Sequence, residues 1–502
     1  MVRVVVIGID GLDADLLRVY GPSLPNLRLL MLESPYLELQ SCFPPDHAPS
    51  WASIYTGRNP AQHGILSISS IPSIFSIQSN PEQAGSSTSC IPEGETFWER
   101  ASQAGKRVCI VNPLFPYFAS TLNGVMHAFP SWDSQEVGAG KKRSFARFCQ
   151  SLHTITEQQT AIGLELLQRE PWDVFFIQFP ALDAVQHLFW RYSDPGDPAY
   201  PGKNEHSGRI RDCYALFDRV IGRFRAAMGD DCVLLIVSGY GHGRGHLHYL
   251  NLNEWLRAEG LLVTQPRHAR LTRLFYAHAL NARARQRSLA LLTLQHAHPT
   301  YLSGSFADEY IISQQYIARH IDQQATLAQV AMMPHSPTFG GISLNQAAIQ
   351  ARRSTGNYEQ VRNSIVQRLL HMRLHGRPVV HRAKVREEMY SGEYIDRFPD
   401  ILFELRNEYG VSAAVHVPLT TNNLLHSIVS GAHQMQGVLL LGNLPTGIHI
   451  CETGNEPTVM DVAPTIISLL GIPVTDANKN GQHNGWPLVK LTNTVALLRG
   501  PL

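Results

Sequence analysis

An aspartate and a histidine four residues apart, Asp183 and His187, form the clearest candidate for metal chemistry in the sequence. If the surrounding segment PALDAVQHLFW is helical, both side chains lie on one face and can bind one metal ion. Such a pair also occurs by chance on many helices, where the histidine only hydrogen-bonds the carboxylate. The pair therefore indicates a metal site only if other parts of the chain supply further ligands.

Two other places carry side chains of the same kind. Asp10 directly follows the first apolar run, and His242, His246 and His248 lie close together in the segment GHGRGHLHY. Imidazole and carboxylate groups are ordinary zinc ligands, and the glycines of this segment allow it to bend. Histidine clusters in loops are also common without a metal, so these residues are candidates only.

The elements that must position these residues follow a regular order. Short runs that are mainly apolar and rich in β-branched residues alternate with segments of helical periodicity, and each apolar run ends in polar or glycine-rich sequence. The runs are residues 4–9, 107–111, 174–179 and 232–237. This order predicts an α/β fold with a mostly parallel, doubly wound sheet that carries helices on both faces. In such sheets ligands bind at the carboxyl ends of the strands, where the candidate residues lie.

Charge and composition exclude some classes of function. The chain of 502 residues has 42 Lys and Arg against 41 Asp and Glu, a formal net charge of +1. No field of one sign is available to bind nucleic acid or an anionic membrane by bulk charge. Charged residues make up 17% and hydrophobic residues 44%, which is typical of a compact globular protein. We expect neither nucleic acid nor membrane as a partner.

Cysteine usage and hydropathy indicate a compartment. The seven cysteines are widely spread, with no C-x-x-C pair, which is typical of reduced, buried thiols. The apolar run at the N-terminus meets Asp10 before it reaches the length of a signal peptide's apolar region, and no stretch approaches the ~18 apolar residues of a membrane span. We therefore expect a cytoplasmic protein.

Three motifs carry a resemblance to a known family. They are VIGIDG at residues 6–11, FPPDHAPSWASIYTGRNPAQHGI at 43–65 and SGAHQMQGVLLL at 430–441. Together they resemble the alkaline phosphatase superfamily, most closely its type I phosphodiesterase and nucleotide pyrophosphatase branch. The likeness continues in FPDILFEL at 398–405 and DVAPTIISLLGIPV at 461–474, and residues 267–328 are the least similar part.

The resemblance implies two divalent ions, usually zinc, at the carboxyl ends of the sheet. The first ion is bound in this family by an aspartate and a histidine four residues apart and by a distant histidine, which match Asp183, His187 and His433. One carboxylate and two imidazoles suit Zn²⁺ and leave a fourth position for a phosphoryl oxygen. We expect one Zn²⁺ per chain at these three residues.

The groups that bind the second ion in the family are mostly replaced. Of those groups the aspartate after the first strand is present as Asp10, but the Thr or Ser nucleophile is replaced by His47. The Asp-His pair of the family's Ser-Asp-His-Gly turn is replaced by Gly239 and Tyr240. Metal coordination is what makes such a hydroxyl nucleophilic, so these losses are coupled. We predict a protein that binds a small phosphate, phosphonate or sulfate ester with its hydrolysis impaired or lost.

An active enzyme is the alternative. His47 and Asp10 could bind a second metal together with one of His242, His246 and His248, because imidazole suits zinc. His47 could also attack phosphorus itself or act as a general base. Either arrangement would make the chain a working phosphoric ester hydrolase with a one-metal or histidine-rebuilt centre.

Two further interpretations concern other residues. Ser50 or Ser53 could replace the missing nucleophile. The arginine-rich residues 267–287 predict a helix with a basic face, which is more often a solvated surface than a partner-binding site.

For the organisation of the chain we predict a core in two parts, residues 1–262 and 396–502. A smaller helical or cap segment, residues 263–395, is inserted between them. The identity of the ester and the oligomeric state are not predicted.

Overall fold

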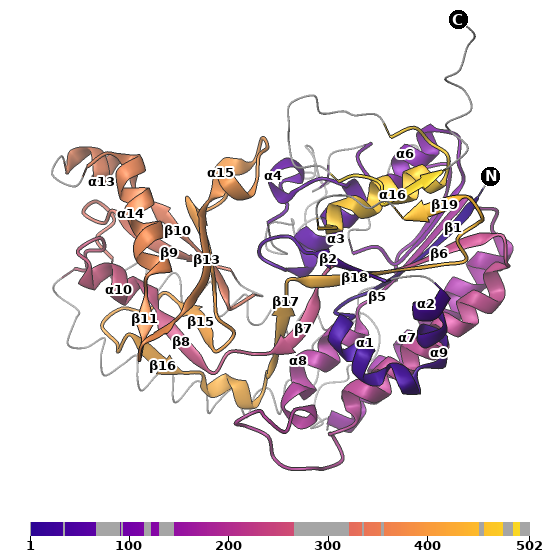
Figure 1. Ribbon diagram of the computed structural model, residues 1–502, viewed down its shortest axis with the longest axis horizontal. Coiled ribbons are helices and arrows are strands. Elements are labelled where there is room, and N and C mark those ends of the chain that lie inside the picture. The colour runs from indigo at the N-terminus through magenta and orange to yellow at the C-terminus, as the bar shows by residue number, and fades with distance from the viewer. Residues whose placement is uncertain are drawn as a thin grey trace, which may run out of the picture.

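The computed structural model describes residues 2–33, 36–66, 91, 94–114, 122–129, 145–265, 321–333, 336–352, 356–450, 456–474 and 485–491. The basic helix expected at residues 267–287 lies outside these ranges. Within them the chain forms a large central sheet with its helices and a smaller lobe that has a sheet of its own (Figure 1).

The central sheet has seven strands and is mostly parallel. In spatial order they are β2 (Leu37–Gln40), β18 (Gln436–Gly442), β6 (Cys232–Ser238), β1 (Arg3–Ile9), β5 (Val174–Phe179), β3 (Val108–Val111) and β4 (Gly124–His127). Strand β1 pairs in parallel with β5 and β6, while β18 is antiparallel to both β6 and β2. The four apolar runs of the sequence are thus the strands β1, β3, β5 and β6, and the predicted mostly parallel sheet is confirmed.

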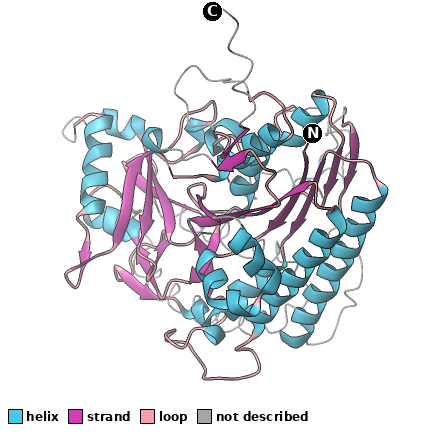
Figure 2. Ribbon diagram, turned by 45° about the vertical axis from the view of Figure 1, so that its right-hand side comes forward, coloured by secondary structure: helices cyan, strands magenta, loops and turns pink. Residues whose placement is uncertain are grey.

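Helices cover both faces of this sheet, as Figure 2 shows. On one face lie α1 (Ala14–Tyr20), α2 (Pro25–Glu33), α7 (Phe145–Arg169), α8 (Ala181–Ser193) and α9 (Arg209–Met228); on the other lie α3 (His47–Thr56), α6 (Phe97–Gln103) and α16 (Val462–Leu469). Alternate residues of β1 enter the two cores: Val5 and Ile7 pack with the first set and Val4 and Val6 with the second. Because both faces are buried, the strand is apolar from Val4 to Ile9.

The smaller lobe lies on the left in Figure 1. Its sheet is antiparallel, in the order β13 (Val380–Val385), β14 (Ile401–Leu405), β10 (Phe339–Leu344) and β9 (Ala328–Met332). Its helices are α10 (Leu252–Ala258), α13 (Gln346–Ala351), α14 (Tyr358–Leu370) and α15 (Arg386–Met389). Strand β14 follows residue 395, so this sheet draws on both sides of the predicted boundary there. The division of the chain at residues 262 and 395 stays a prediction.

Short elements complete the described chain. They are η1 (Gly21–Ser23), α4 (Pro60–His63), β7 (Gly241–Arg244), β8 (His248–Asn251), β11 (Arg373–Leu374), β12 (Arg377–Pro378), η5 (Ile395–Arg397), β15 (Tyr409–Ser412), β16 (Thr420–Asn422), η6 (Leu424–Ser427), β17 (Gly431–Gln434), β19 (Ile448–Ile450), η7 (Val459–Asp461) and β20 (Val489–Leu491). Strand β8 pairs with β15 and β16, and β7 pairs with β17. Among the described helices, none combines the length and apolar character needed to cross a bilayer.

Candidate metal centre

Asp183 and His187 lie where the carboxyl end of β5 turns into α8. The strand ends at Phe179, Pro180 is the N-cap residue, and α8 begins at Ala181, so Asp183 is in its first turn. His187 follows one helical turn later on the same face. Asp183 Oδ1 lies 3.6 Å from His187 Nε2. The helical spacing predicted from the sequence is therefore present.

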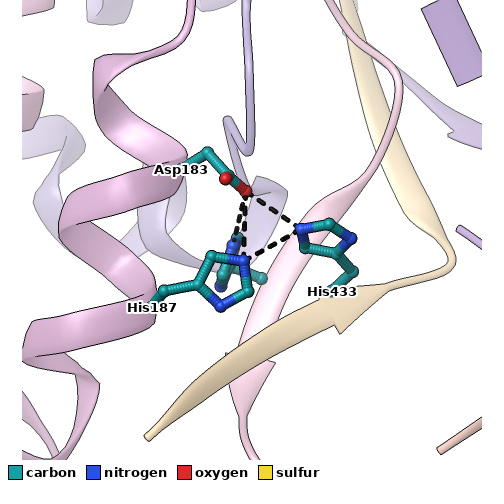
Figure 3. A group of neighbouring side chains, drawn as sticks. Asp183, His187 and His433 are labelled. Carbon is teal, nitrogen blue, oxygen red and sulfur yellow. Dashed lines mark hydrogen bonds and ion pairs between the residues drawn. The ribbon is translucent and has the colours of Figure 1, made fainter. Parts of the chain in front are cut away.

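Two more histidines reach this carboxylate from a short antiparallel pair of strands. In the ladder between β17 and β7, His433 lies directly opposite His242, and side chains opposite each other in a ladder are neighbours. Asp183 Oδ1 is 3.1 Å from His433 Nε2 and 2.9 Å from His242 Nε2. Figure 3 shows Asp183, His187 and His433 converging from the helix and the strand. Potential ligand atoms of the four residues all lie within 4.8 Å of one another.

Hydrogen bonds at the far side of two of the rings orient their nitrogens. His187 Nδ1 donates to the carbonyl of Gly431 at 2.9 Å, and His433 Nδ1 donates to that of Pro45 at 2.8 Å. The Nε2 atoms therefore point inwards, only 3.1 Å apart. Carbonyl anchors of this kind are typical of histidines that bind metals.

The charges of the cluster favour a bound cation. Burial lowers the pKa of His187 to about 3, so this imidazole is neutral and can coordinate. Burial alone would raise the pKa of Asp183, but the neighbouring histidines lower it well below its usual range. For His433, burial lowers the pKa, and the charge of Asp183 more than offsets this and raises it. The cluster thus offers an ionised carboxylate and a neutral imidazole to a divalent ion.

Asp10 and His47 form a second, separate contact. Asp10 follows β1 and is completely buried, and His47 begins α3. His47 Nε2 lies 2.8 Å from Asp10 Oδ2, and Gln178 Nε2 donates to the two Asp10 oxygens at 3.2 and 3.4 Å. The indole of Trp51 donates to Asp10 Oδ1. Burial lowers the pKa of His47, but the charge and hydrogen bond of Asp10 raise it overall. Protein donors therefore satisfy both oxygens of Asp10.

Comparison with known proteins identifies the family. The family model of type I phosphodiesterase / nucleotide pyrophosphatase matches residues 4–423. The chain belongs to this family. The family is metal-dependent and acts on small phosphate esters. A comparison with curated proteins gives no significant match.

Solved structures of other proteins have a fold similar to that of this family member. Phosphonoacetate hydrolase from Sinorhizobium meliloti 1021, in complex with phosphonoformate, is 16% identical with a TM-score of 0.52, and the match covers 93% of this chain and 96% of that one. Its complex with phosphonoacetate gives 15% identity and the same TM-score and coverage. An inactive form of murine ectonucleotide pyrophosphatase/phosphodiesterase 5 with AMP is 12% identical, covers 95% of this chain and 97% of that one, and has a TM-score of 0.48.

In this family member, Gly239 and Tyr240 occupy the two positions of the turn after β6 at which the resemblance implies metal ligands. A β-carbon on Gly239 would lie 2.8 Å from Cβ of Ser50, closer than such atoms approach. Tyr240 is buried, and its ring centroid is 4.2 Å from that of His433. The turn after β6 therefore has no room for the missing aspartate and uses the second position for aromatic packing.

The other sequence candidates of this phosphodiesterase-family chain have partners elsewhere. Ser50 Oγ is 3.0 Å from Ser41 Oγ, and Ser53 Oγ is 3.0 Å from His63 Nε2.

The two remaining histidine candidates also have partners away from Asp10. His246 Nε2 accepts from Asn423 at 3.1 Å, and His248 Nδ1 is 3.1 Å from Asn422 Oδ1. Neither His246 nor His248 belongs to the metal-competent cluster found within the described residues.

Two residues of the Asp10 contact are absent from the sequence-based prediction. Trp51 lies four residues after His47 and therefore shares its face of α3. Gln178 is the one polar residue in the otherwise apolar strand β5. These two features are the signals that could have identified them.

We expect the stability of this protein to fall in mild acid because of two buried histidines outside the cluster. Burial lowers the pKa of His63 and of His246 from 6.5 to about 3. Below pH 6.5 the unfolded chain binds protons at both positions and the folded chain does not, so the free energy of unfolding decreases until the pH approaches 3. One pH unit below 6.5, the loss is about 1.4 kcal/mol for each histidine.

Urea denaturation at about pH 7.5 and about pH 5.5 measures this loss. The difference between the two pH values should be smaller in His63→Gln than in the wild type, because glutamine does not titrate. His153→Gln, at an exposed position of α7, is the matched control and should keep the wild-type difference. An equal pH dependence in the wild type and His63→Gln would contradict the prediction.

Proposed function

We propose that this family member binds one zinc ion and a small phosphate-type ester, and that its ester hydrolysis is impaired or lost. The observation that carries the proposal is the contrast between two carboxylates. Asp183 faces histidine nitrogens that converge on one point, whereas both oxygens of Asp10 accept hydrogen bonds from His47, Trp51 and Gln178. One metal site is intact, and the place of the other is taken by protein groups.

The donor set supports zinc at the first site. Asp183, His187 and His433 offer one carboxylate and two imidazoles, which is a borderline-hard set that Zn²⁺ prefers. When bound, the ion would polarise a phosphoryl oxygen and neutralise part of the charge of the ester. The carbonyl groups of Gly431 and Pro45 would hold the rings of His187 and His433 with their Nε2 atoms towards that ion.

A second ion lacks both ligands and space. An ion at Asp10 would have to displace donors that already satisfy this buried carboxylate, and Gly239 offers no replacement ligand. Position 47 carries an imidazole in place of a hydroxyl. A single ion cannot clamp both the attacking and the leaving oxygen of an in-line displacement, so the step that the family accelerates loses its main support.

Metal analysis and turnover test the proposal together. We expect elemental analysis of the purified protein to give one zinc per chain, and we expect no turnover of bis(4-nitrophenyl) phosphate above that of the chelated protein. Titration calorimetry with AMP and with phosphonoacetate, the latter chosen because a structural relative binds it, should detect binding that chelation removes. Two tightly bound ions per chain, or turnover that depends on zinc, would contradict the proposal.

An active hydrolase is the second candidate, and one observation favours it. The bond of 2.8 Å between Asp10 and His47 resembles the arrangement in which a buried carboxylate orients a catalytic imidazole. In that case His47 would act as nucleophile or general base on an ester bound at the zinc ion. Turnover that persists in the wild type and disappears in His47→Ala, with zinc content unchanged, would select this candidate. A phosphorylated His47 detected by mass spectrometry would identify the nucleophilic version.

A further inference from the structure

We propose that His242 is a fourth protein ligand of the single ion and completes a tetrahedral set of protein donors around it. This inference rests on the proposed function, in which Asp183, His187 and His433 bind that ion. It differs from a rebuilt second site, because His242 hydrogen-bonds Asp183 at 2.9 Å while the partner of Asp10 is His47.

The position of His242 follows from the strand that carries it. In the ladder of β7 and β17 it lies opposite His433, so both side chains leave the ladder at the same level. The backbone N–H of His242 donates to Asp13 Oδ2 at 3.2 Å, which holds β7 against the start of α1. The ladder and this hydrogen bond together place the ring of His242 before any ion binds.

Close backbone approach brings this ladder to α8. A β-carbon on Gly431 would lie 2.3 Å from the carbonyl oxygen of Gln186, and one on Gly243 would lie 2.7 Å from the side chain of Gln434. At position 431 only glycine allows this approach to backbone, and it lets β17 lie directly beside the turn of α8 that carries His187. The two histidines of the ladder therefore reach a carboxylate on the helix.

The ring of His242 is also fixed by its neighbours. Its side chain has no exposed surface, its centroid is 4.5 Å from that of His187, and it stacks on Trp190 at 6.3 Å with an angle of 25°. A buried ring packed on two sides cannot turn away from Asp183 without moving these neighbours. The imidazole is thus preorganised as a ligand.

Four protein ligands change the chemistry that the ion can support. Zinc sites with four protein donors are typically structural, whereas catalytic sites keep a position open for water or substrate. The resemblance implies no metal ligand directly after the Ser-Asp-His-Gly turn. This chain has His242 at that position. One carboxylate and three imidazoles already fill a tetrahedral sphere, so a phosphoryl oxygen could reach the ion only as a fifth ligand, which adds a second cause of impaired hydrolysis.

The cobalt-substituted variant His242→Cys tests the assignment. A thiolate bound to Co²⁺ gives a sulfur-to-metal charge-transfer band in the near ultraviolet, which appears only if residue 242 contacts the ion. We expect this band in His242→Cys loaded with Co²⁺ and not in the matched control His248→Cys, which lies on the same segment but outside the cluster. If a folded His242→Cys protein that still binds Co²⁺ lacked the charge-transfer band, the proposal would be overturned.

Two further measurements keep the test decisive if that variant does not fold. X-ray absorption of zinc in the unchanged protein should give three imidazole rings around the ion, and two rings would overturn the proposal. In His242→Ala the affinity for zinc should fall at least about 100-fold, because even partners that only support a ligand are worth about 10- to 100-fold. Unchanged affinity would count against the fourth ligand. A second zinc ion or turnover would instead count against the proposed function.

Discussion

Asp183→Ala is expected to abolish zinc binding at the concentrations at which the wild type is saturated. Asp183 is the one anionic group of the cluster, and its Oδ1 lies within 3.6 Å of three imidazole nitrogens. Without it the ion would be a buried charge with only neutral ligands. Removing one member of a buried ion pair costs about 3–5 kcal/mol, which corresponds to a loss of affinity of about 10²- to 10⁴-fold.

Competition with a chromogenic chelator measures that loss. Asp197→Asn is the matched control, because Asp197 is also buried and bonds His426 at 2.9 Å but lies outside the cluster. This variant should lose stability and keep its zinc affinity. If Asp183→Ala retained zinc as tightly as Asp197→Asn does, the cluster around Asp183 would not be the metal site.

Gly239→Asp is expected to destabilise the protein and to leave its metal content unchanged, although it restores the residue that the family resemblance implies there. The new β-carbon would meet Cβ of Ser50 at 2.8 Å. Overpacking of a core costs about 1–3 kcal/mol, and a buried carboxylate without a partner costs several kcal/mol more. We therefore expect a loss of about 3–5 kcal/mol or more in the free energy of unfolding.

A series of variants separates the steric part of this loss from the charge. Gly239→Ala adds only the β-carbon and should cost about 1–3 kcal/mol, while Gly21→Ala, where a β-carbon has free space, is the control. Ser50→Gly removes the atom that clashes, so adding it to Gly239→Asp should recover part of the stability.

The restored set His47→Thr, Gly239→Asp and Tyr240→His should bind a second zinc ion only if Ser50 is changed as well. Two ions with Ser50 intact would show that the turn can move.

The fold was predictable from the sequence because its signal is local. Residues 4–9 and 232–237 are apolar throughout, residues 174–179 are apolar except for Gln178, and such runs alternate with helical periodicity. Burial on both faces requires this composition wherever the strand lies in the sheet. The spacing of Asp183 and His187 is equally local, since one turn of helix is enough to place both side chains on one face.

Other parts of the site depend on contacts between distant segments. His242 faces Asp183 because of the register of β7 against β17. The first residues of these strands, Gly241 and Gly431, are 190 residues apart in the sequence. That Asp10 is satisfied by Trp51 and Gln178 follows from the packing of α3 and β5 around the end of β1. The spacing of residues along the chain determines neither the register of two strands nor the distance between packed elements.

The sequence by itself therefore determined the fold class, the family resemblance and the replacement of the family's groups by His47, Gly239 and Tyr240. The tertiary structure alone decided which groups now stand beside Asp10 and which histidine joins Asp183. The physical reason is that residue types and local periodicity are properties of short segments, whereas a ligand set is formed by atoms that long-range strand pairing and helix packing bring within a few ångströms.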